Sequence, residues 1–467
     1  MNTDLFIPGV SREDLTIIQE RLGLNSLSEL KKAAKGRKIR KLAGLGSKTE
    51  MAVLRGIKLL EASPEFLPSG IVTDFSKMLI DKLKTWPNVS QVLIVGDLRR
   101  GCAEVNKIEF LLETDDFGSL SNFLLELPGL KKEIVREKDV ISFSSALGLP
   151  VIFHLATPFQ WGTRSILTTG SEQHVQALKK ITPTLPLTDC EEKVYNKMGL
   201  SWIPPEIRET GREVQLALEG NLPKLIDIKM VKGDLHLHSR WSDGVNTIEE
   251  IIQQAIRLGY DYIAITDHSQ SLKVAGGLSP QDLFNQGKEI SLLQKKYPQI
   301  KILKGIEVDI LEDGSLDFTD DILNSLDMVI ASVHSYFHMS EEDMTRRVVK
   351  ALQNPYVKIL AHPTGRILGK RTGYAIDINK VIDTAVAYNK ILEINASPDR
   401  LDLRDTHLQI AKTKGAKIAI NTDAHNLEKM KDMVFGVQTA RRGWQTIDDI
   451  INCWSYEKLE DQLKIKK

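Results

Sequence analysis

The C-terminal half of the chain repeats one pattern seven times: an apolar segment of strand length, followed in most cases by a stretch of helical character. The segments lie at 232–238, 262–268, 302–308, 328–334, 357–362, 391–395 and 417–423. Strands that alternate with helices predict a parallel sheet with crossover connections. A β/α barrel brings the carboxyl ends of all its strands to one face, and that face carries the active site.

A polar residue stands at or beside the end of every segment. These residues are His238, His268, Glu307, His334, His362, Asn395 and Asp423. One histidine at a strand end usually makes a structural hydrogen bond, but repetition at nearly every strand end favours ligands that converge. The remaining histidines lack this placement and are interpreted as structural. They are His154, His174, His338 and His407.

Nine side chains make up the set of candidate metal ligands. They are His236, His238, Asp243, His268, Glu307, His334, His362, Asp423 and His425. Mixed imidazole and carboxylate ligation suits Zn²⁺, Mn²⁺ or Fe²⁺ better than Ca²⁺ or Mg²⁺. Several such ions fit phosphoester hydrolysis, because they activate water, hold the phosphate and stabilise charge on the leaving oxygen.

Further polar residues near the strand ends are candidates for substrate contact. The cations that could hold a phosphate are Lys273, Arg366, Arg371 and Arg400, and ordinary surface charge is the alternative for each. Arg366 is the strongest of them, because it follows a ligand closely in the run His-Pro-Thr-Gly-Arg. Ser269 and Asn395 are candidates for contact with the ligands or with the substrate.

Residues 1–66 are predicted to form short helices with glycine-containing turns. Backbone N–H groups that such turns leave exposed at a helix start bind phosphate oxygens without reading bases. The candidates for DNA-backbone contact are Gly9, Gly44, Gly46 and Lys48. Residues 31–58 include ten lysines and arginines but only one acidic residue, Glu50, although the formal net charge of the whole chain is zero. A solvated helix face is the alternative interpretation.

Residues 67–228 carry a mixed pattern. A helix is predicted over 71–84 and strands over 91–95, 107–112 and 151–156. Three motifs with polar residues lie in this region: Gly-Asp-Leu-Arg-Arg at 96–100, Thr-Gly-Ser-Glu-Gln-His at 169–174 and Trp-Ile-Pro-Pro-Glu-Ile-Arg-Glu at 202–209.

In this order, after two glycine turns, the motifs resemble the fingers, palm and thumb of a bacterial family X DNA polymerase. The C-terminal half resembles the PHP (polymerase and histidinol phosphatase) domain that follows them in that family. The resemblance implies helix-hairpin-helix fingers at 1–66, a nucleotidyltransferase-like palm at 67–157, a thumb at 158–228 and a distorted (β/α)7 PHP barrel at 229–467. It covers essentially the whole chain, except that the usual N-terminal lyase-type domain is missing.

The resemblance also implies an arrangement of three divalent metal ions. His236, His238, Glu307 and Asp423 would hold one ion. Glu307 would bridge to a second ion, held also by His334 and His362, and a third would bind Asp243, His268 and His425. The activity implied is 3′→5′ exonuclease or 3′-end processing in DNA repair, with DNA 3′ ends or gaps as the partner.

The palm departs from its family where nucleotide transfer would occur. That reaction needs two metal ions held by a cluster of carboxylates. The matching positions are Lys107, Glu109 and Ile152, and the serine that normally follows the motif glycine is Asp97. A protonated lysine repels a metal ion and isoleucine offers no oxygen, so this palm is predicted not to polymerise DNA.

The composition indicates a soluble protein of several domains, with 467 residues, 42% hydrophobic and 27% charged. No apolar run approaches the roughly 20 residues of a membrane span, and the start of the chain lacks the features of a signal peptide. Three scattered cysteines, Cys102, Cys190 and Cys453, indicate no disulfide framework, so a cytoplasmic setting is expected.

Two other functions stay open. A histidinol-phosphatase-like enzyme would use the same ligands on small phosphomonoesters. A non-catalytic DNA-binding scaffold would explain the degenerate palm, although it leaves the complete ligand set without a role. An amidohydrolase is disfavoured, because the third strand carries Glu307 in place of a metal-bridging lysine.

Overall fold

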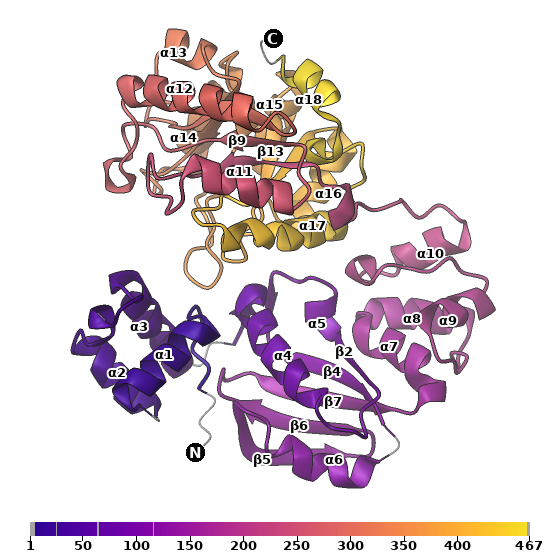
Figure 1. Cartoon of the computed structure of the whole chain (residues 1–467). Helices are drawn as coiled ribbons and strands as arrows, with labels where there is room; N and C mark the ends of the chain where they lie inside the picture. The colour runs from indigo at the N-terminus through magenta and orange to yellow at the C-terminus, as the bar shows by residue number, and fades with distance from the viewer. Residues whose placement is uncertain (1–4, 25, 63–64, 115, 465–467) are drawn as a thin grey trace. The chain divides into compact units, whose positions relative to one another are not determined.

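The computed structural model describes residues 5–24, 26–62, 65–114 and 116–464. The chain divides into two compact units, Met1–Leu222 and Pro223–Lys467, each with its own hydrophobic core. The division lies close to residue 229, where the sequence pattern changes. Figure 1 labels the helices and strands of both units. Within the described ranges, no helix has the length and apolar character needed to cross a membrane.

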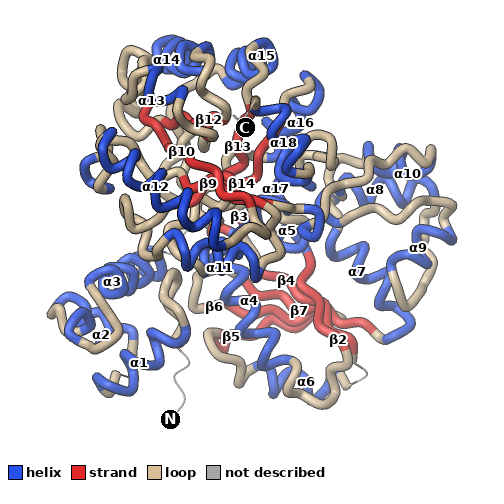
Figure 2. The backbone as a smooth tube through the Cα atoms, turned by 45° about the horizontal axis from the view of Figure 1, so that its top comes forward, coloured by secondary structure: helices blue, strands red, loops and turns tan. Residues whose placement is uncertain are grey.

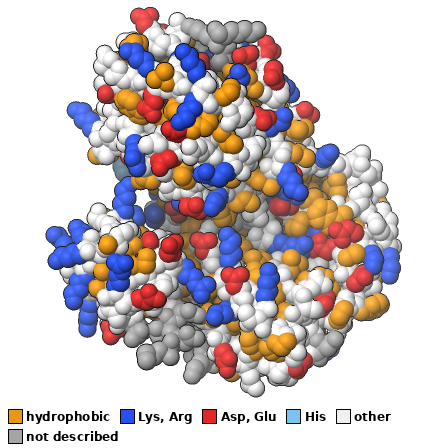
Figure 3. Space-filling model, viewed as in Figure 1, with side chains coloured by type: hydrophobic (Ala, Val, Ile, Leu, Met, Phe, Trp, Pro, Cys, Tyr) orange, Lys and Arg blue, Asp and Glu red, His pale blue; other side chains and the backbone are white. Residues whose placement is uncertain are grey.

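Three helices enclose a small apolar core at the start of the first unit. They are α1 (Arg12–Leu22), α2 (Leu27–Lys35) and α3 (Ser47–Ala62). Helix α1 buries Leu15 and Ile18 against this core. A glycine in the left-handed region precedes two of the helices, Gly9 (φ 77°) before α1 and Gly44 (φ 87°) before α3. Figure 3 shows lysine and arginine side chains gathered over this segment.

A five-stranded sheet follows in the same unit, in the order β2-β4-β7-β6-β5. Its strands are β2 (Gln91–Val95), β4 (Ile108–Glu113), β5 (Leu130–Glu137), β6 (Val140–Ser145) and β7 (Pro150–Ala156). Strands β4 and β7 are parallel neighbours, whereas the other pairs in this sheet are antiparallel. The surrounding elements are β1 (Leu67–Pro68), α4 (Ser69–Leu83), α5 (Gly96–Arg99), β3 (Glu104–Val105) and α6 (Phe117–Leu124). Phe75, Phe110 and Phe153 lie in the shared core.

Four helices complete the first unit. They are α7 (Trp161–Thr169), α8 (Glu172–Ile181), α9 (Glu191–Lys197) and α10 (Arg212–Leu218). His174 is fully buried between them, with Nδ1 2.8 Å from Glu213 Oε1 and Nε2 3.1 Å from the Tyr195 hydroxyl. Both ring nitrogens have a partner within the protein, so His174 acts in packing, as its position in the sequence indicates.

The second unit is built on a seven-stranded parallel sheet that closes almost into a barrel. Its strands are β8 (Gly233–Leu237), β9 (Tyr262–Ile265), β10 (Lys301–Asp309), β11 (Met328–Ser332), β12 (Ile359–Leu360), β13 (Ile391–Asn395) and β14 (Lys417–Asn421). They follow one another in sequence order across the sheet. A parallel bridge between Leu237 and Ala424 joins the two edges. All seven predicted strands are present, and Figure 2 labels five of them, β9, β10, β12, β13 and β14.

Helices connect these strands and surround them. They are α11 (Ile248–Arg257), α12 (Pro280–Lys296), α13 (Asp320–Asn324), α14 (Glu341–Gln353), α15 (Ile378–Ala387), α16 (Asp405–Lys414), α17 (Met433–Arg442) and α18 (Tyr456–Leu463). Local sequence fixes where they start. Helix α11, for example, begins with a capping box between Thr247 and Glu250. The strands are buried on both faces, which explains why they read as continuous apolar runs.

Candidate metal centre

All nine candidate ligands lie together at the carboxyl-end face of the barrel. His236 belongs to β8 and Glu307 to β10, and the other ligands follow the ends of strands or lie in the loops beyond them. Three overlapping groups have ligand atoms within 4.8 Å of one another. They are His238–Asp243–His268–His425, His236–His238–Glu307 and His268–Glu307–His334. His362 and Asp423 join them through contacts with the same side chains.

We number three ligand groups after the three ions that the resemblance implies. The first group, His236, His238, Glu307 and Asp423, surrounds one point with four ligand atoms. Asp423 Oδ1 lies 3.6 Å from His236 Nε2 and 3.0 Å from His238 Nε2. Glu307 Oε2 lies 3.5 Å and 3.6 Å from the same two nitrogens. Tetrahedral ligands about 2.0–2.2 Å from an ion lie about 3.3–3.6 Å from one another, so this spacing fits a metal ion.

Glu307 presents its other oxygen to a second group. Its Oε1 lies 3.3 Å from His334 Nε2 and 3.1 Å from His362 Nε2. The carboxylate is fully buried, so neither oxygen is exposed to solvent. One oxygen towards each group is the geometry of a bridging ligand.

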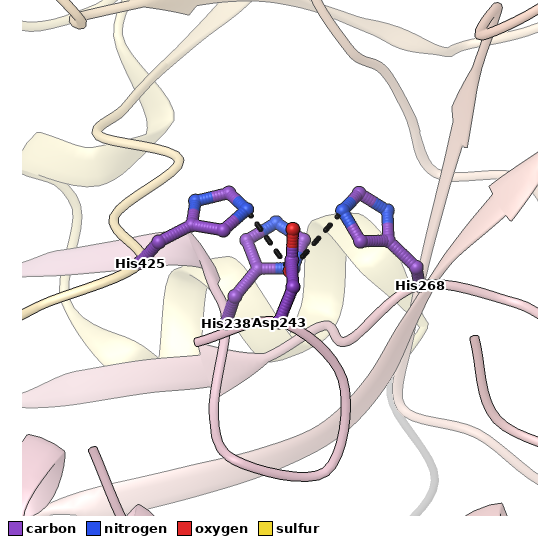
Figure 4. Close-up of side chains that lie close together, drawn as sticks. All are labelled: His238, Asp243, His268 and His425. Atoms are coloured by element: carbon purple, nitrogen blue, oxygen red, sulfur yellow. Dashed lines mark ion pairs between the residues drawn. The ribbon is translucent and has the colours of Figure 1, made fainter. Parts of the chain in front are cut away.

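The third group gathers around Asp243. Its Oδ1 lies 3.2 Å from His425 Nε2 and 3.6 Å from His268 Nε2, as Figure 4 shows. The His238 ring stacks on His425 with centroids 4.1 Å apart, so it borders this group as well as the first. The resemblance assigns His238 to the first ion alone. In the structure His238 directly follows β8 and borders both the first and the third group.

The buried ligand atoms have the unmet bonding capacity of a cation site. Among the described residues, His236 Nε2, His238 Nε2, Glu307 Oε2 and Asp423 Oδ1 are buried side-chain atoms without a hydrogen-bond partner. Buried polar atoms are nearly always satisfied, because leaving one unpaired costs about 1–3 kcal/mol. These four atoms are also the ones that surround a single point. The residues present therefore fit a divalent metal ion.

The electrostatics of the centre favour ionised carboxylates. Burial opposes ionisation of Glu307, but the neighbouring histidines, His334 first among them, hold its pKa well below the usual value. Burial also opposes ionisation of Asp423, and His236 and His238 hold its pKa well below normal. Both carboxylates are thus charged near neutral pH and suited to bind a cation.

Two carboxylates outside the ligand set fix the orientation of ligands. Glu393 Oε1 lies 2.8 Å from His236 Nδ1, and Glu393 Oε2 accepts the backbone N–H of His362 at 2.8 Å. Asp309 Oδ1 lies 2.6 Å from His334 Nδ1. Such contacts fix the tautomer of a metal-binding histidine. The sequence analysis did not identify either acid, although Glu393 stands two residues from the candidate Asn395 and Asp309 stands two residues from the candidate ligand Glu307.

The predicted substrate-contact residues fall into different environments. Asn395 donates from Nδ2 to Asp423 Oδ2 at 2.9 Å, in contact with a ligand as expected. The buried Ser269 hydroxyl accepts the backbone N–H of Asp309 at 3.0 Å. Lys273 opens the short turn Lys273–Ala275 in the loop that follows His268.

The three arginines differ in what they contact. Arg366 donates to the backbone carbonyls of Arg400 and Leu401, so it braces the loop after β13. Arg371 donates to the Gly365 carbonyl at 2.8 Å, and its guanidinium lies over a phenylalanine ring. Arg400 contacts a candidate ligand, with Nε 4.0 Å from Asp423 Oδ2.

The palm positions form a cluster of a different kind. Lys107 Nζ lies 3.0 Å from Glu109 Oε2, and His154 Nε2 lies 3.2 Å from Glu109 Oε1. Ile152 is the register partner of Glu109 across β4 and β7. The Asp97 carboxylate is paired with Arg100. The only side-chain carboxylate among Lys107, Glu109 and Ile152 is thus already paired with protein groups.

The glycine turns of the N-terminal helices face open space. A Cβ placed on Gly9, Gly44 or Gly46 would meet no described atom within 4 Å. Gly46 itself is not in the left-handed region, in contrast to the other two. Lys48 is exposed in the first turn of α3. The space beside these three α-carbons is therefore open among the described residues.

Both halves of the chain are similar to known proteins. Residues 234–397 match the family described as PHP domain. The DNA polymerase/3′-5′ exonuclease PolX of Bacillus subtilis (strain 168) is 38% identical over 98% of this chain and 84% of that protein. A probable phosphatase of Thermoanaerobacter sp. (strain X514) is 33% identical over 50% of this chain and 95% of that protein.

Similarity to a solved structure is weaker. A histidinol phosphate phosphatase of Lactococcus lactis, crystallised with zinc, L-histidinol and phosphate, aligns with 44% of this chain and 93% of its own length. The identity is 21% and the TM-score 0.34, too low to carry an argument.

Proposed function

The chain belongs to the bacterial family X DNA polymerases that carry a PHP domain, and on that premise we propose that it is a metal-dependent phosphoesterase that removes nucleotides from the 3′ ends of DNA. The barrel is its catalytic part. The N-terminal helices are helix-hairpin-helix fingers that hold the DNA backbone, and the five-stranded sheet and following helices are a palm and thumb without polymerase activity. The scattered free cysteines agree with a cytoplasmic setting.

One observation carries the proposal. In a chain with an exonuclease relative along nearly its full length, nine side chains converge, and seven of their buried atoms lack a hydrogen-bond partner within the described residues, four of them around one point. We assign three divalent ions to them, as Zn²⁺, Mn²⁺ or Fe²⁺. When bound, such ions lower the pKa of a water molecule towards neutrality and neutralise phosphate charge.

The protein's own groups supply orientation and phosphate contacts. Glu393 and Asp309 fix the rings of His236 and His334 through their second nitrogens. Arg400, beside Asp423, is the favoured contact for the scissile phosphate, and Lys273 for a neighbouring one. Arg366 and Arg371 serve this site indirectly by bracing its loops, and Ser269 does the same for β10.

DNA shortening from a defined end tests the assignment. Wild-type protein with Mn²⁺ should shorten a 5′-labelled, 3′-recessed oligonucleotide stepwise, and His236→Ala should not. Co-purifying nuclease is excluded if the variant, purified identically, is inactive. No cleavage of single-stranded, recessed or abasic DNA with Mn²⁺, Zn²⁺ or Fe²⁺ would overturn the proposal.

The palm is proposed to have lost nucleotide transfer. Lys107 brings a positive charge to Glu109 where a metal ion would be needed, and Ile152 has no oxygen. Primer extension should therefore be absent with Mg²⁺ or Mn²⁺. The assay needs the His236→Ala background, so that exonuclease activity does not hide synthesis. Template-directed extension would contradict the proposal.

A small-molecule phosphatase is the second candidate. The observation that favours it is the likeness of the barrel half alone to a probable phosphatase, which aligns over 95% of its own length. Matched assays on labelled oligonucleotides and on histidinol phosphate or sugar phosphates separate the two candidates. The nuclease assignment requires higher kcat/KM on DNA.

A further inference from the structure

A buried aspartate, Asp267, holds the loop that runs from His238 to Asp243. Its Oδ1 accepts the backbone N–H of Ser239 at 2.8 Å, the backbone N–H of Ser242 at 3.2 Å and the Ser242 hydroxyl at 2.5 Å. Its Oδ2 accepts the Ser239 hydroxyl at 2.6 Å. One carboxylate therefore fixes both ends of the short segment that separates two candidate ligands.

The same carboxylate is anchored to helix α12. Gln286 on α12 donates from Nε2 to Asp267 Oδ2 at 2.6 Å. The loop makes a second contact with that helix, because Trp241 Nε1 donates to Glu289 Oε2 at 2.8 Å. Asp267 directly precedes His268, so the network links two ligands of the third group to one helix outside the barrel.

The other two ligand groups are supported differently. Their ligands stand in or directly beyond strands, and their outer partners are Glu393 and Asp309. Glu307 is 1% exposed at its side chain, whereas Asp243 is 38% and His425 35% exposed. The third group thus combines the greatest access to solvent with a ligand on a loop, and that loop depends on Asp267.

We propose that Asp267 is a positioning residue that sets the metal affinity of the third group alone, and that the ion held there is the one that exchanges readily with solvent. The proposal rests on the three-ion assignment above and deepens it. Asp243 enters the site from a loop, so its carboxylate is in place only while that loop is held. Loss of the Asp267 contacts would release Asp243 and leave the strand-borne ligands where they are.

Metal retention tests the proposal without an activity assay. Asp267→Asn keeps the size of the side chain but turns an NH₂ group towards hydrogen-bond donors. Wild-type protein loaded with Mn²⁺ should keep two ions tightly and bind a third in titration. The variant should bind the third ion about 10–100-fold more weakly, with the first two unchanged.

The matched control is Asp309→Asn, which changes the partner of His334 in the second group. It should weaken retention of a tightly held ion and leave the third titration step in place. The proposal is overturned if Asp267→Asn keeps the wild-type third step, or if both variants lose the same ions.

A milder variant guards against a folding defect. Ser242→Ala removes one hydroxyl donor to Asp267, and it should weaken the third step less than Asp267→Asn with an unchanged Tm. If Asp267→Asn unfolds, a wild-type third step in Ser242→Ala overturns the proposal. Cleavage of 3′-recessed DNA by the wild-type protein is measured in parallel. If the wild-type protein does not cleave, the exonuclease assignment fails. If it binds only two ions, the third metal site fails.

Discussion

The proposed palm and the barrel each bury a glutamate beside histidine, and the two carboxylates meet different surroundings. In the palm, Lys107 contacts one oxygen of Glu109 and His154 the other. In the barrel, Glu307 faces only imidazoles, and its Oε2 has no hydrogen-bond partner among the described side chains. Burial opposes ionisation in both, and in both the neighbouring groups lower the pKa.

The difference is in what supplies the positive charge. A lysine that neutralises Glu109 gives this sheet an ion pair without any metal. Neutral imidazoles have a lone pair to offer, so the barrel glutamate and its neighbours could hold a cation together. Unmet bonding capacity, more than residue type, marks the barrel residues as the ones suited to hold a metal ion.

The largest effect is expected from Glu307→Gln. The amide cannot bridge two ions with two anionic oxygens, so several kcal/mol of charge stabilisation are lost, equivalent to on the order of 10³-fold in rate. Exonuclease rates on a 3′-recessed oligonucleotide measure it, with bound metal counted in the same samples. Glu109→Gln is the matched control and should leave both unchanged. Equal losses from the two substitutions would erase the contrast between palm and barrel.

A smaller effect is expected when only the outer partner is changed. Glu393→Gln removes the carboxylate beside His236 Nδ1 and should lower metal affinity or activity about 10–100-fold. Competition with a chelator of known affinity measures the change. Gln409→Glu, a surface substitution in α16, is the control for the handling of charge variants. Wild-type affinity in Glu393→Gln would show that the histidine needs no outer partner.

Sequence periodicity predicted the barrel well, because strand length and helical spacing are local properties. The ligands followed from it, since a parallel barrel fixes where its strand ends lie. Glu393 and Asp267 were missed because their roles depend on partners distant in the chain, such as His236 and Ser239. Closeness in sequence to a candidate ligand also does not fix where a long side chain points. Arg366 lies four residues after His362, yet its guanidinium contacts the backbone beyond β13.

DNA affinity should respond to the N-terminal helices and not to the barrel ligands. Lys48→Ala removes a cation beside the Gly44 turn, so the slope of log K against log salt should fall by about 1. Fluorescence anisotropy with duplex DNA at several salt concentrations measures this slope. Lys58→Ala, towards the other end of α3, is the control and should change it less. An unchanged slope in Lys48→Ala would remove this turn from the proposed DNA contact.

The smallest effect concerns the ion pair between Lys107 and Glu109 in the proposed palm. Lys107→Met should destabilise the first unit by about 1 kcal/mol or less, because the lysine is 43% exposed and its charge is screened. The folded-state pKa of Glu109 is lowered, so its contribution is present above the unfolded pKa and is lost as pH falls through the folded value. The difference between wild type and variant should therefore be largest near pH 7 and shrink towards pH 3. Calorimetry of both proteins across that range measures it, with Lys193→Met of the exposed pair with Asp189 as control. A variant more stable than wild type at pH 7 would mean that the palm glutamate does not need its lysine.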